Sequence, residues 1–347
     1  MQISILKPDD WHVHLRDGPA MAAVAHFTAA RFGRAIIMPN LKPAVTTTEL
    51  ARAYRERILA ALPAGGAFEP LMTLYLTDRT DPREIDRARE SGIVHGVKLY
   101  PAGATTHSDA GVTDIARVHP VLERMQERGV PLLIHGESAA PDVDPFDRET
   151  RFVDEVLAPL VERFSSLKVI LEHITTRRAV EFVGGARGGV AATITPQHLL
   201  HNRGAIFAGG IRPHYYCLPL LKREEDRRAL VAAATSGDPR YFLGTDSAPH
   251  ERGAKLAACG CAGMFTAHAA VELYAEVFED AGALDRLEGF ASRFGAQFYG
   301  LAPHQEKITL IRDAWTPPPQ YEFGAGHVVP YRAGETVRWR LAPGTAR

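Results

Sequence analysis

The chain has 347 residues, with 40 Lys and Arg against 41 Asp and Glu, so its formal net charge at pH 7 is −1. A charge this close to zero provides no attraction to nucleic acid or to an acidic membrane surface. The sequence contains no apolar run of about 18 residues and no signal-peptide core. We therefore expect a soluble protein without a targeting segment, which binds neither nucleic acid nor membranes.

The composition is that of an ordinary globular protein, with 46% hydrophobic and 23% charged residues. Three cysteines are too few for a disulfide framework in a chain of this length, which favours a reducing compartment and a cytoplasmic location. The 15 histidines direct attention to metal binding and acid–base chemistry.

Short runs rich in Val, Ile and Leu recur along the chain and predict buried strands. These runs are residues 11–14, 34–38, 71–76, 94–100, 131–135, 168–173, 190–195 and 241–245. Stretches with the periodicity of amphipathic helices lie between them, at residues 48–62, 82–91, 118–128, 148–164 and 223–235.

This alternation predicts one α/β domain over residues 1–347, with a parallel sheet closed as a (β/α)8 TIM barrel. A doubly wound open sheet is the alternative. Residues 305–347 contain a run of three prolines and a strand-like segment at 335–339. We interpret them as a C-terminal tail that packs on the outside of the barrel.

Polar and ionisable residues gather at the C-terminal ends of the predicted strands, where barrel enzymes build their active sites. They are His12, His14, Asn40, Lys98, His135, His173 and Asp246. This placement favours the barrel over the open sheet.

His12 and His14 are two residues apart, so on a strand both imidazoles project to the same face and one cation can bind both. An isolated pair of this kind can equally be two hydrogen-bonded structural histidines. The metal interpretation is favoured because His135 and His173 end apolar strands, and Asp246 could supply a carboxylate.

Lys98 is harder to place, since an ammonium has no lone pair for a cation. Burial beside cations could lower its pKa and allow reaction with carbon dioxide, which would give a carbamate able to bridge two metals. The alternatives are that Lys98 is a clamp for substrate charge or that its side chain snorkels to solvent.

These residues occur in segments that resemble the dihydroorotases of the short, monofunctional bacterial type, within the amidohydrolase superfamily. The segments are 10–18 (DWHVHLRDG), 38–40 (MPN), 98–106 (KLYPAGATT), 135–137 (HGE), 172–176 (EHITT), 193–199 (TITPQHL), 244–250 (GTDSAPH) and 259–263 (CGCAG). Together they are highly specific and extend over most of the chain.

The resemblance implies two zinc ions, one bound by His12, His14 and Asp246 and the other by His135 and His173, with carboxylated Lys98 as the bridge between them. By the same resemblance, five residues bind the substrate and two belong to a mobile loop. The substrate-binding residues are Arg16, Asn40 and His250, which bind its carboxylate, and Leu218 and Ala262, which contact the ring through their backbone. The loop residues are Thr105 and Thr106.

The activity implied by the resemblance is the interconversion of N-carbamoyl-L-aspartate and L-dihydroorotate, with Asp246 as the catalytic proton carrier, in a homodimer. Arg16 offers a planar fork that suits a carboxylate. Residues 101–111 form a small, polar loop that we expect to close over the site. His107 departs from the family pattern, in which Asn is expected.

Two other functions stay open. A hydantoinase or allantoinase could share the metal ligands, but it would not need Arg16, Asn40 and His250 to bind a carboxylate. A catalytically silent scaffold would be expected to lack some of the ligands. We predict no third metal at Cys217, Cys259 and Cys261, because a structural zinc site usually needs four ligands. Glu272 and Glu276 are expected on solvated helix faces.

Overall fold

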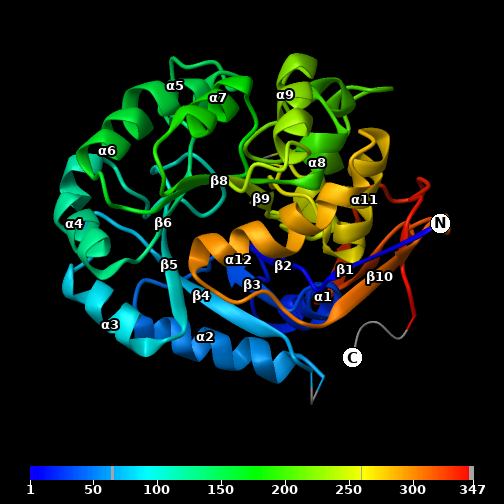
Figure 1. Ribbon diagram of the computed structural model, residues 1–347, viewed down its shortest axis with the longest axis horizontal. Coiled ribbons are helices and arrows are strands. Elements are labelled where there is room, and N and C mark those ends of the chain that lie inside the picture. The colour runs from blue at the N-terminus through cyan, green and yellow to red at the C-terminus, as the bar shows by residue number, and fades with distance from the viewer. Residues whose placement is uncertain (64–65, 259, 344–347) are drawn as a thin grey trace.

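The computed structural model describes residues 1–63, 66–258 and 260–343, and its centre is a sheet of eight parallel strands (Figure 1). The strands are β2 (Asp9–Val13), β3 (Arg34–Ile37), β4 (Glu69–Tyr75), β5 (Val94–Leu99), β6 (Leu132–His135), β7 (Val169–Glu172), β8 (Val190–Ile194) and β9 (Tyr241–Leu243). Each pairs with the next along the chain, and a parallel bridge from Val13 to Ser247 brings the end of β9 back to β2. The predicted barrel is confirmed, and the consecutive strand order excludes the doubly wound sheet.

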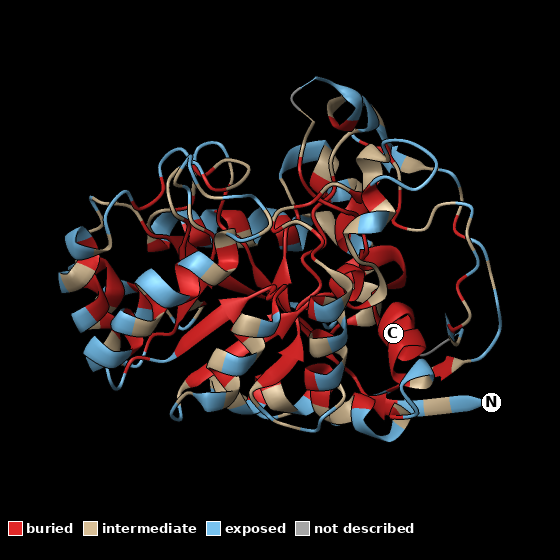
Figure 2. Cartoon of the chain, turned by 90° about the horizontal axis from the view of Figure 1, so that it is seen from above, coloured by how far each residue is buried: buried red, intermediate tan, exposed pale blue. Residues whose placement is uncertain are grey.

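Helices surround the barrel and turn their exposed faces outward, whereas the strands are buried (Figure 2). They are α1 (Gly18–Arg31), α2 (Thr48–Ala61), α3 (Arg83–Ser91), α4 (His119–Arg128), α5 (Arg148–Phe152), α6 (Ala158–Arg163), α7 (Arg177–Gly185), α8 (Pro196–Leu200), α9 (Glu224–Ala234), α10 (Arg252–Leu256), α11 (Ala270–Asp280) and α12 (Phe294–Tyr299). The single helix predicted at 148–164 is interrupted by a π-helical turn at Val153–Leu157.

The barrel interior is filled by large apolar side chains, so the barrel is a packed core with no pore. Trp11, Leu133 and Phe242 belong to this cluster, and α12 packs against its N-terminal end. Gly295 in α12 permits this approach, since a Cβ there would lie 2.0 Å from Nε1 of Trp11. With this end of the barrel closed, a ligand must enter from the opposite end.

The C-terminal tail packs outside the barrel, as predicted. Strand β10 (Lys307–Ile311) pairs with β1 (Gln2–Leu6) on one side and with β13 (Arg340–Leu341) on the other. Strands β11 (Tyr321–Phe323) and β12 (Gly326–Val328) form a separate hairpin. The strand predicted at 335–339 is wrong, because the paired segment is β13 and only Val337 in that range makes a bridge, to Trp315.

Glu272 and Glu276, expected in solvent, are instead 1% and 2% exposed. Arg31 donates to both oxygens of Glu272, and Arg332 pairs with Glu276. The prediction failed because the tail covers the outer face of α11, and helix periodicity does not reveal such a cover. The two arginines neutralise the acids that are buried beneath the tail.

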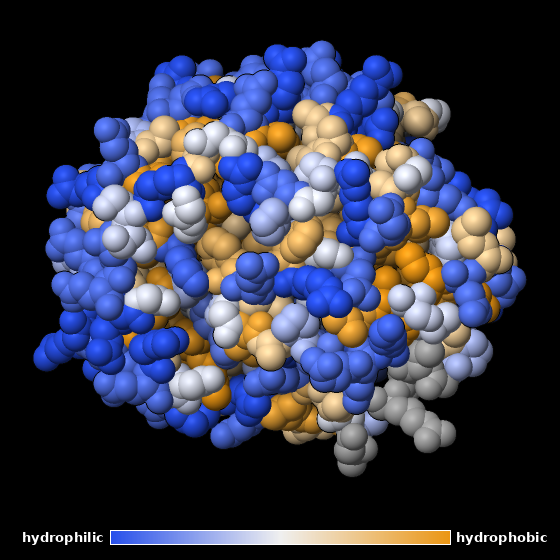
Figure 3. Space-filling model, viewed as in Figure 1, coloured by the Kyte–Doolittle hydropathy of each residue, from blue (hydrophilic) through white to orange (hydrophobic). Residues whose placement is uncertain are grey.

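No helix in the described ranges is long and apolar enough to cross a membrane. The face of the molecule in Figure 3 is largely hydrophilic, with hydrophobic groups in separate patches.

Candidate active site

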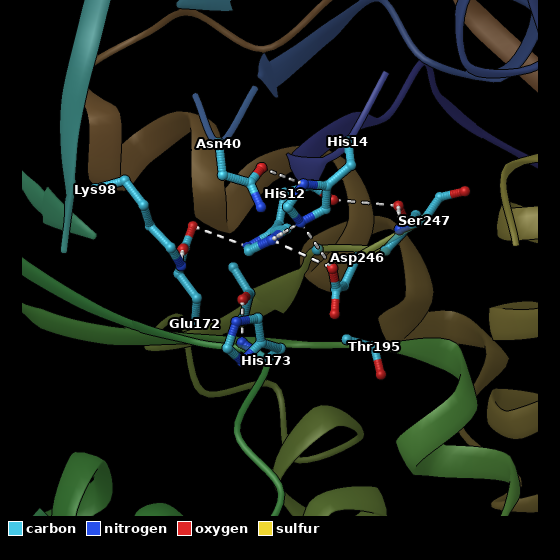
Figure 4. Close-up of polar contacts among 12 residues, drawn as sticks. His12, His14, Asn40, Lys98, Glu172, His173, Thr195, Asp246 and Ser247 are labelled. Carbon is cyan, nitrogen blue, oxygen red and sulfur yellow. Dashed lines mark hydrogen bonds and ion pairs between the residues drawn. The ribbon is translucent and has the colours of Figure 1, made fainter. Parts of the chain in front are cut away.

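The ionisable side chains selected from the sequence converge at the C-terminal ends of the barrel strands (Figure 4). His12 and Lys98 lie within β2 and β5, and His135 ends β6. His173 and Asp246 follow β7 and β9, and both have positive φ angles, of 44° and 45°. Non-glycine residues adopt this conformation at a cost, and such residues cluster at active sites.

Three candidate ligand atoms meet where β2 and β9 end. Nε2 of His12 lies 3.3 Å from Nε2 of His14, and these nitrogens lie 3.4 and 3.2 Å from Oδ1 of Asp246. His14 is oriented by Asn40, whose Oδ1 lies 2.8 Å from its Nδ1. The arrangement leaves the three inward atoms facing one another.

His173 and His135 continue this cluster toward β6. The His173 ring centroid lies 4.9 Å from that of His12 and 4.8 Å from that of His135. Nε2 of His135 pairs with Oε2 of Glu137 at 2.8 Å, which leaves its Nδ1 as the nitrogen for a ligand. One potential ligand atom from each of His12, His173 and Asp246 lies within 4.8 Å of the others.

Lys98 is completely buried, and its Nζ contacts Oε2 of Glu172. The other oxygen of Glu172 faces Nδ1 of His12 at 3.1 Å. Glu172 therefore holds both Lys98 and His12, which leaves Nε2 of His12 directed at Asp246.

Burial and mutual contacts shift the pKa values of this cluster in different directions. Burial lowers the pKa of His14 to about 4 and that of His173 well below its ordinary value. Burial also lowers the pKa of Lys98. Burial opposes protonation of His12 as well, but Glu172 and Asp246 raise its pKa to about 9. Burial opposes the ionisation of Asp246, but the neighbouring imidazoles of His12 and His14 outweigh it and hold the pKa of Asp246 well below the ordinary value.

The donor set fits a metal centre. Nδ1 of His173 is buried without a hydrogen-bond partner among the described residues. Buried polar atoms are normally satisfied, and neutral imidazoles with a carboxylate are typical ligands of zinc. Carboxylates beside His12 and His135 provide the outer hydrogen bonds common around metal-binding histidines.

Of the candidate substrate-binding residues, Arg16, Asn40, Leu218 and Ala262 line the same cavity, whereas His250 is not part of its lining. The lining also includes His12, His14, His135, His173 and Asp246. Arg16 donates through Nε to the Pro249 carbonyl at 2.8 Å, and its Nη2 lies 2.9 Å from Nε2 of His250. Within the described residues, the N–H groups of Leu218 and Ala262 make no hydrogen bond, so both are free to contact a ligand.

The loop at 101–111 covers this cavity. Thr105 and Thr106 line it, and Nδ2 of Asn40 donates to the Thr106 carbonyl at 3.2 Å. Nδ1 of His107 lies 3.1 Å from the Asn40 carbonyl and can donate to it. The remaining cavity volume is about 20 Å³, roughly one water molecule.

Two cysteines of the sequence lie near this site, and Cys259 falls outside the described residues. Cys217 is buried and its thiol donates to the Pro219 carbonyl at 3.2 Å, whereas Cys261 is half-buried. Both are free thiols.

Three acidic residues of the site were not given roles from the sequence. Glu172 and Glu137 contact candidate ligands, as described above. Asp10 accepts hydrogen bonds from the backbone and side chain of Thr245, at 2.9 and 2.6 Å, and so joins β2 to the end of β9. The available signal was a carboxylate within or just after an apolar strand, as at Glu172.

Comparisons with known proteins agree with this geometry. Residues 9–316 match the model of the amidohydrolase family, and the chain belongs to that family. It is 65% identical to a dihydroorotase of Aromatoleum aromaticum, over 98% of this chain and 99% of that protein. The dihydroorotase of Campylobacter jejuni has a TM-score of 0.89 at 36% identity, covering 98% of this chain and 97% of that one. That of Saccharomyces cerevisiae, in complex with 5-fluoroorotic acid, has a TM-score of 0.90 at 33% identity, covering 98% of both chains. Within the amidohydrolases, the chain is therefore similar over nearly its full length to dihydroorotases.

Proposed function

We propose that this chain is a zinc-dependent enzyme that interconverts N-carbamoyl-L-aspartate and L-dihydroorotate, the third step of pyrimidine biosynthesis. The observation that supports this most strongly is the convergence of five candidate metal ligands and a group suited to carboxylate binding on one cavity. The near full-length similarity to dihydroorotases supports the same reaction.

In this proposal His12, His14 and Asp246 would hold one zinc ion, His135 and His173 would hold a second, and carboxylated Lys98 would be a ligand shared by both. Zinc, when bound, supplies Lewis-acid chemistry, which activates water for attack near neutral pH and polarises a carbonyl. The lowered pKa of Lys98 makes its neutral amine accessible for reaction with carbon dioxide. The nitrogen of a lysine carbamate retains one N–H, which can still donate to Glu172.

Arg16 and His250 are suited to hold the substrate carboxylate. Burial and the nearby Arg16 lower the pKa of His250 to about 2, so this imidazole is neutral. Its Nε2 lies 2.9 Å from both Nη2 of Arg16 and the Ala262 carbonyl, yet a single nitrogen cannot accept from one and donate to the other simultaneously. A carboxylate inserted here would accept from Arg16 in the planar geometry that this side chain favours.

Asp246 is the residue placed to move a proton. Its carboxylate is anionic and contacts the imidazoles of His12 and His14, at the wall of the cavity. During ring opening it accepts a proton from the attacking water and delivers it to the ring nitrogen as the carbon–nitrogen bond breaks. During ring closure the same carboxylate removes the proton from the carbamoyl nitrogen.

The family resemblance also implies a homodimer in the cytoplasm, and both belong to this proposal. Light scattering on the purified protein tests the dimer through its mass.

The decisive test measures turnover and metal content together. Purified protein should interconvert dihydroorotate and N-carbamoyl-L-aspartate and contain zinc by mass spectrometry. Hydantoin and allantoin serve as comparison substrates because neither carries the ring carboxylate. Turnover of either one, with none on dihydroorotate, would contradict the proposal. A protein purified without chelators that has neither metal nor turnover would instead indicate a scaffold.

A further inference from the structure

Lys255, in α10, is a buried lysine with no role in the chemistry described above. It is 5% exposed, and among the described residues no carboxylate pairs with it. Its Nζ donates instead to three backbone carbonyls, those of Tyr216 at 2.7 Å, Cys261 at 3.0 Å and Gly263 at 2.7 Å. An ammonium has three N–H groups, so its donors and these acceptors match in number.

The three carbonyls belong to the two backbone segments that border the substrate cavity. The Tyr216 carbonyl lies two residues before Leu218, and those of Cys261 and Gly263 flank Ala262. The segments also contact each other directly, since the N–H of Gly263 donates to the Tyr216 carbonyl at 3.0 Å. Lys255 therefore connects both segments, and it is not among the residues that line the cavity.

The chain direction explains why this connection orients the ring-binding groups. The carbonyls of Cys261 and Gly263 point to Lys255, whereas the Ala262 carbonyl between them faces His250. Gly263 has a φ of 149°, and a Cβ there would lie 2.5 Å from the Ala248 carbonyl, so the backbone has little room to move. With the flanking carbonyls fixed, the free N–H of Ala262 is held at the cavity.

We propose that Lys255 is a positioning residue that sets how tightly the site binds the substrate ring, by holding the backbone at Leu218 and Ala262 in place. This inference rests on the proposed function. Burial lowers the pKa of Lys255 to about 8, so the three-donor ammonium still predominates at neutral pH. A neutral amine would leave one carbonyl facing a lone pair.

The experiment compares Lys255→Met, which keeps chain length and removes the donors, with Lys255→Gln, which keeps two donors without the charge. Lys7→Met is the matched control, because Lys7 is 4% exposed and lies before β2, at the end of the barrel opposite the site. Three quantities are measured: KM and kcat for dihydroorotate, and Kd for 5-fluoroorotic acid by calorimetry.

We expect Lys255→Met to raise both KM and Kd about tenfold with a much smaller change in kcat, because ground-state ring binding is what it loses. Lys255→Gln should give an intermediate increase, and it decides the question if the Met variant does not fold. Lys7→Met should leave both constants unchanged. Unchanged KM and Kd in the Lys255 variants, even with lower thermal stability, would overturn the inference alone. Absence of turnover by the unaltered protein would overturn the proposed function and this inference with it.

Discussion

At the scale of single residues, the sequence identified the candidate ligands but not the carboxylates that contact them. The pattern of His12 and His14 on one strand face was readable because strand geometry alone brings two such imidazoles together. The role of Glu172 could not be predicted in this way. Its contacts with Lys98 and His12 join β7 to β5 and β2, and only the closed barrel brings these strands together. The periodicity of a sequence indicates which residues share a face of one element, but it does not indicate which residues meet across the barrel.

Lys98 provides the first prediction. Lys98→Ala should lose nearly all activity, because the proposed bridge between the metals disappears. Short carboxylic acids such as acetate should restore part of that activity, since they can occupy the space of the lost side chain and supply two oxygens. Activity and bound zinc are measured with and without the acid. Unaltered protein treated with the same acid is the control, and full activity in Lys98→Ala without acid would contradict the bridging role.

At the scale of elements, the strands and most helices were predictable because each satisfies its own hydrophobic pattern. The π-helical turn at Val153–Leu157, which interrupts the helix predicted at 148–164, was not predictable. Such turns have no distinct periodicity, and here the apolar pattern continues on both sides. Contacts between different helices could not be predicted from the sequence either. Glu84, within α3, accepts hydrogen bonds from the N–H and hydroxyl of Thr48 at the start of α2, both at 2.7 Å, and also pairs with Arg87.

Glu84 predicts a dependence of stability on pH. Burial opposes its ionisation, but the Thr48 and Arg87 contacts outweigh burial and lower its pKa below the ordinary 4.5. A carboxylate with a depressed pKa stabilises the fold above the ordinary value, and this contribution is lost as the pH falls through the folded-state pKa. Glu84→Gln should therefore lower the free energy of unfolding by about 1–3 kcal/mol at neutral pH.

Urea unfolding at about pH 7 and about pH 3 measures this effect, and the difference between variant and parent should shrink at the lower pH. Glu90→Gln is the control on the same helix, because Glu90 is exposed and makes one long contact with Arg128 at 3.4 Å. We expect it to change stability by less than about 0.5 kcal/mol. An equal effect of Glu84→Gln at both pH values would contradict the assignment.

The loop at 101–111 gives a prediction about motion. A cavity of about 20 Å³ is too small for a six-membered ring, so we predict that the loop opens before substrate enters and then closes again. Thr106→Ala should lower kcat by about 10²-fold if the hydroxyl contacts the reacting ligand in the closed state, while bound zinc stays unchanged. Thr113→Ala, beyond the loop and bonded to Asp78, is the matched control. Unchanged kcat in Thr106→Ala would refute the role of the loop.

At the scale of the whole molecule, the tail is part of the structure that supports the barrel. Ile308, Leu310 and Trp339 belong to the main hydrophobic core together with residues of the barrel strands and helices. The tail position was predictable from its place after the last barrel unit. Its pairing was not predictable, because β10 pairs with β1 from the other end of the chain. The burial of Glu272 and Glu276 was not predictable either, because it depends on contacts between the tail and α11.

Trp339 tests this integration. Its ring is fully buried, its Nε1 donates to Oε2 of Glu279 at 3.1 Å, and its carbonyl accepts from Nε1 of Trp315 at 2.9 Å. Trp339→Ala should lower the free energy of unfolding by about 3–5 kcal/mol, because a large cavity opens between the tail and α11. The same variant should keep its KM and bound zinc at temperatures where it is folded, since the candidate site lies at the barrel end. Phe207→Ala is the control: the Phe207 side chain is 59% exposed, so its removal should have little effect on the free energy of unfolding. A small loss of stability in Trp339→Ala would show that the stability of the barrel does not depend on the tail. Loss of bound zinc in this variant would show that the tail and the site are coupled through the core.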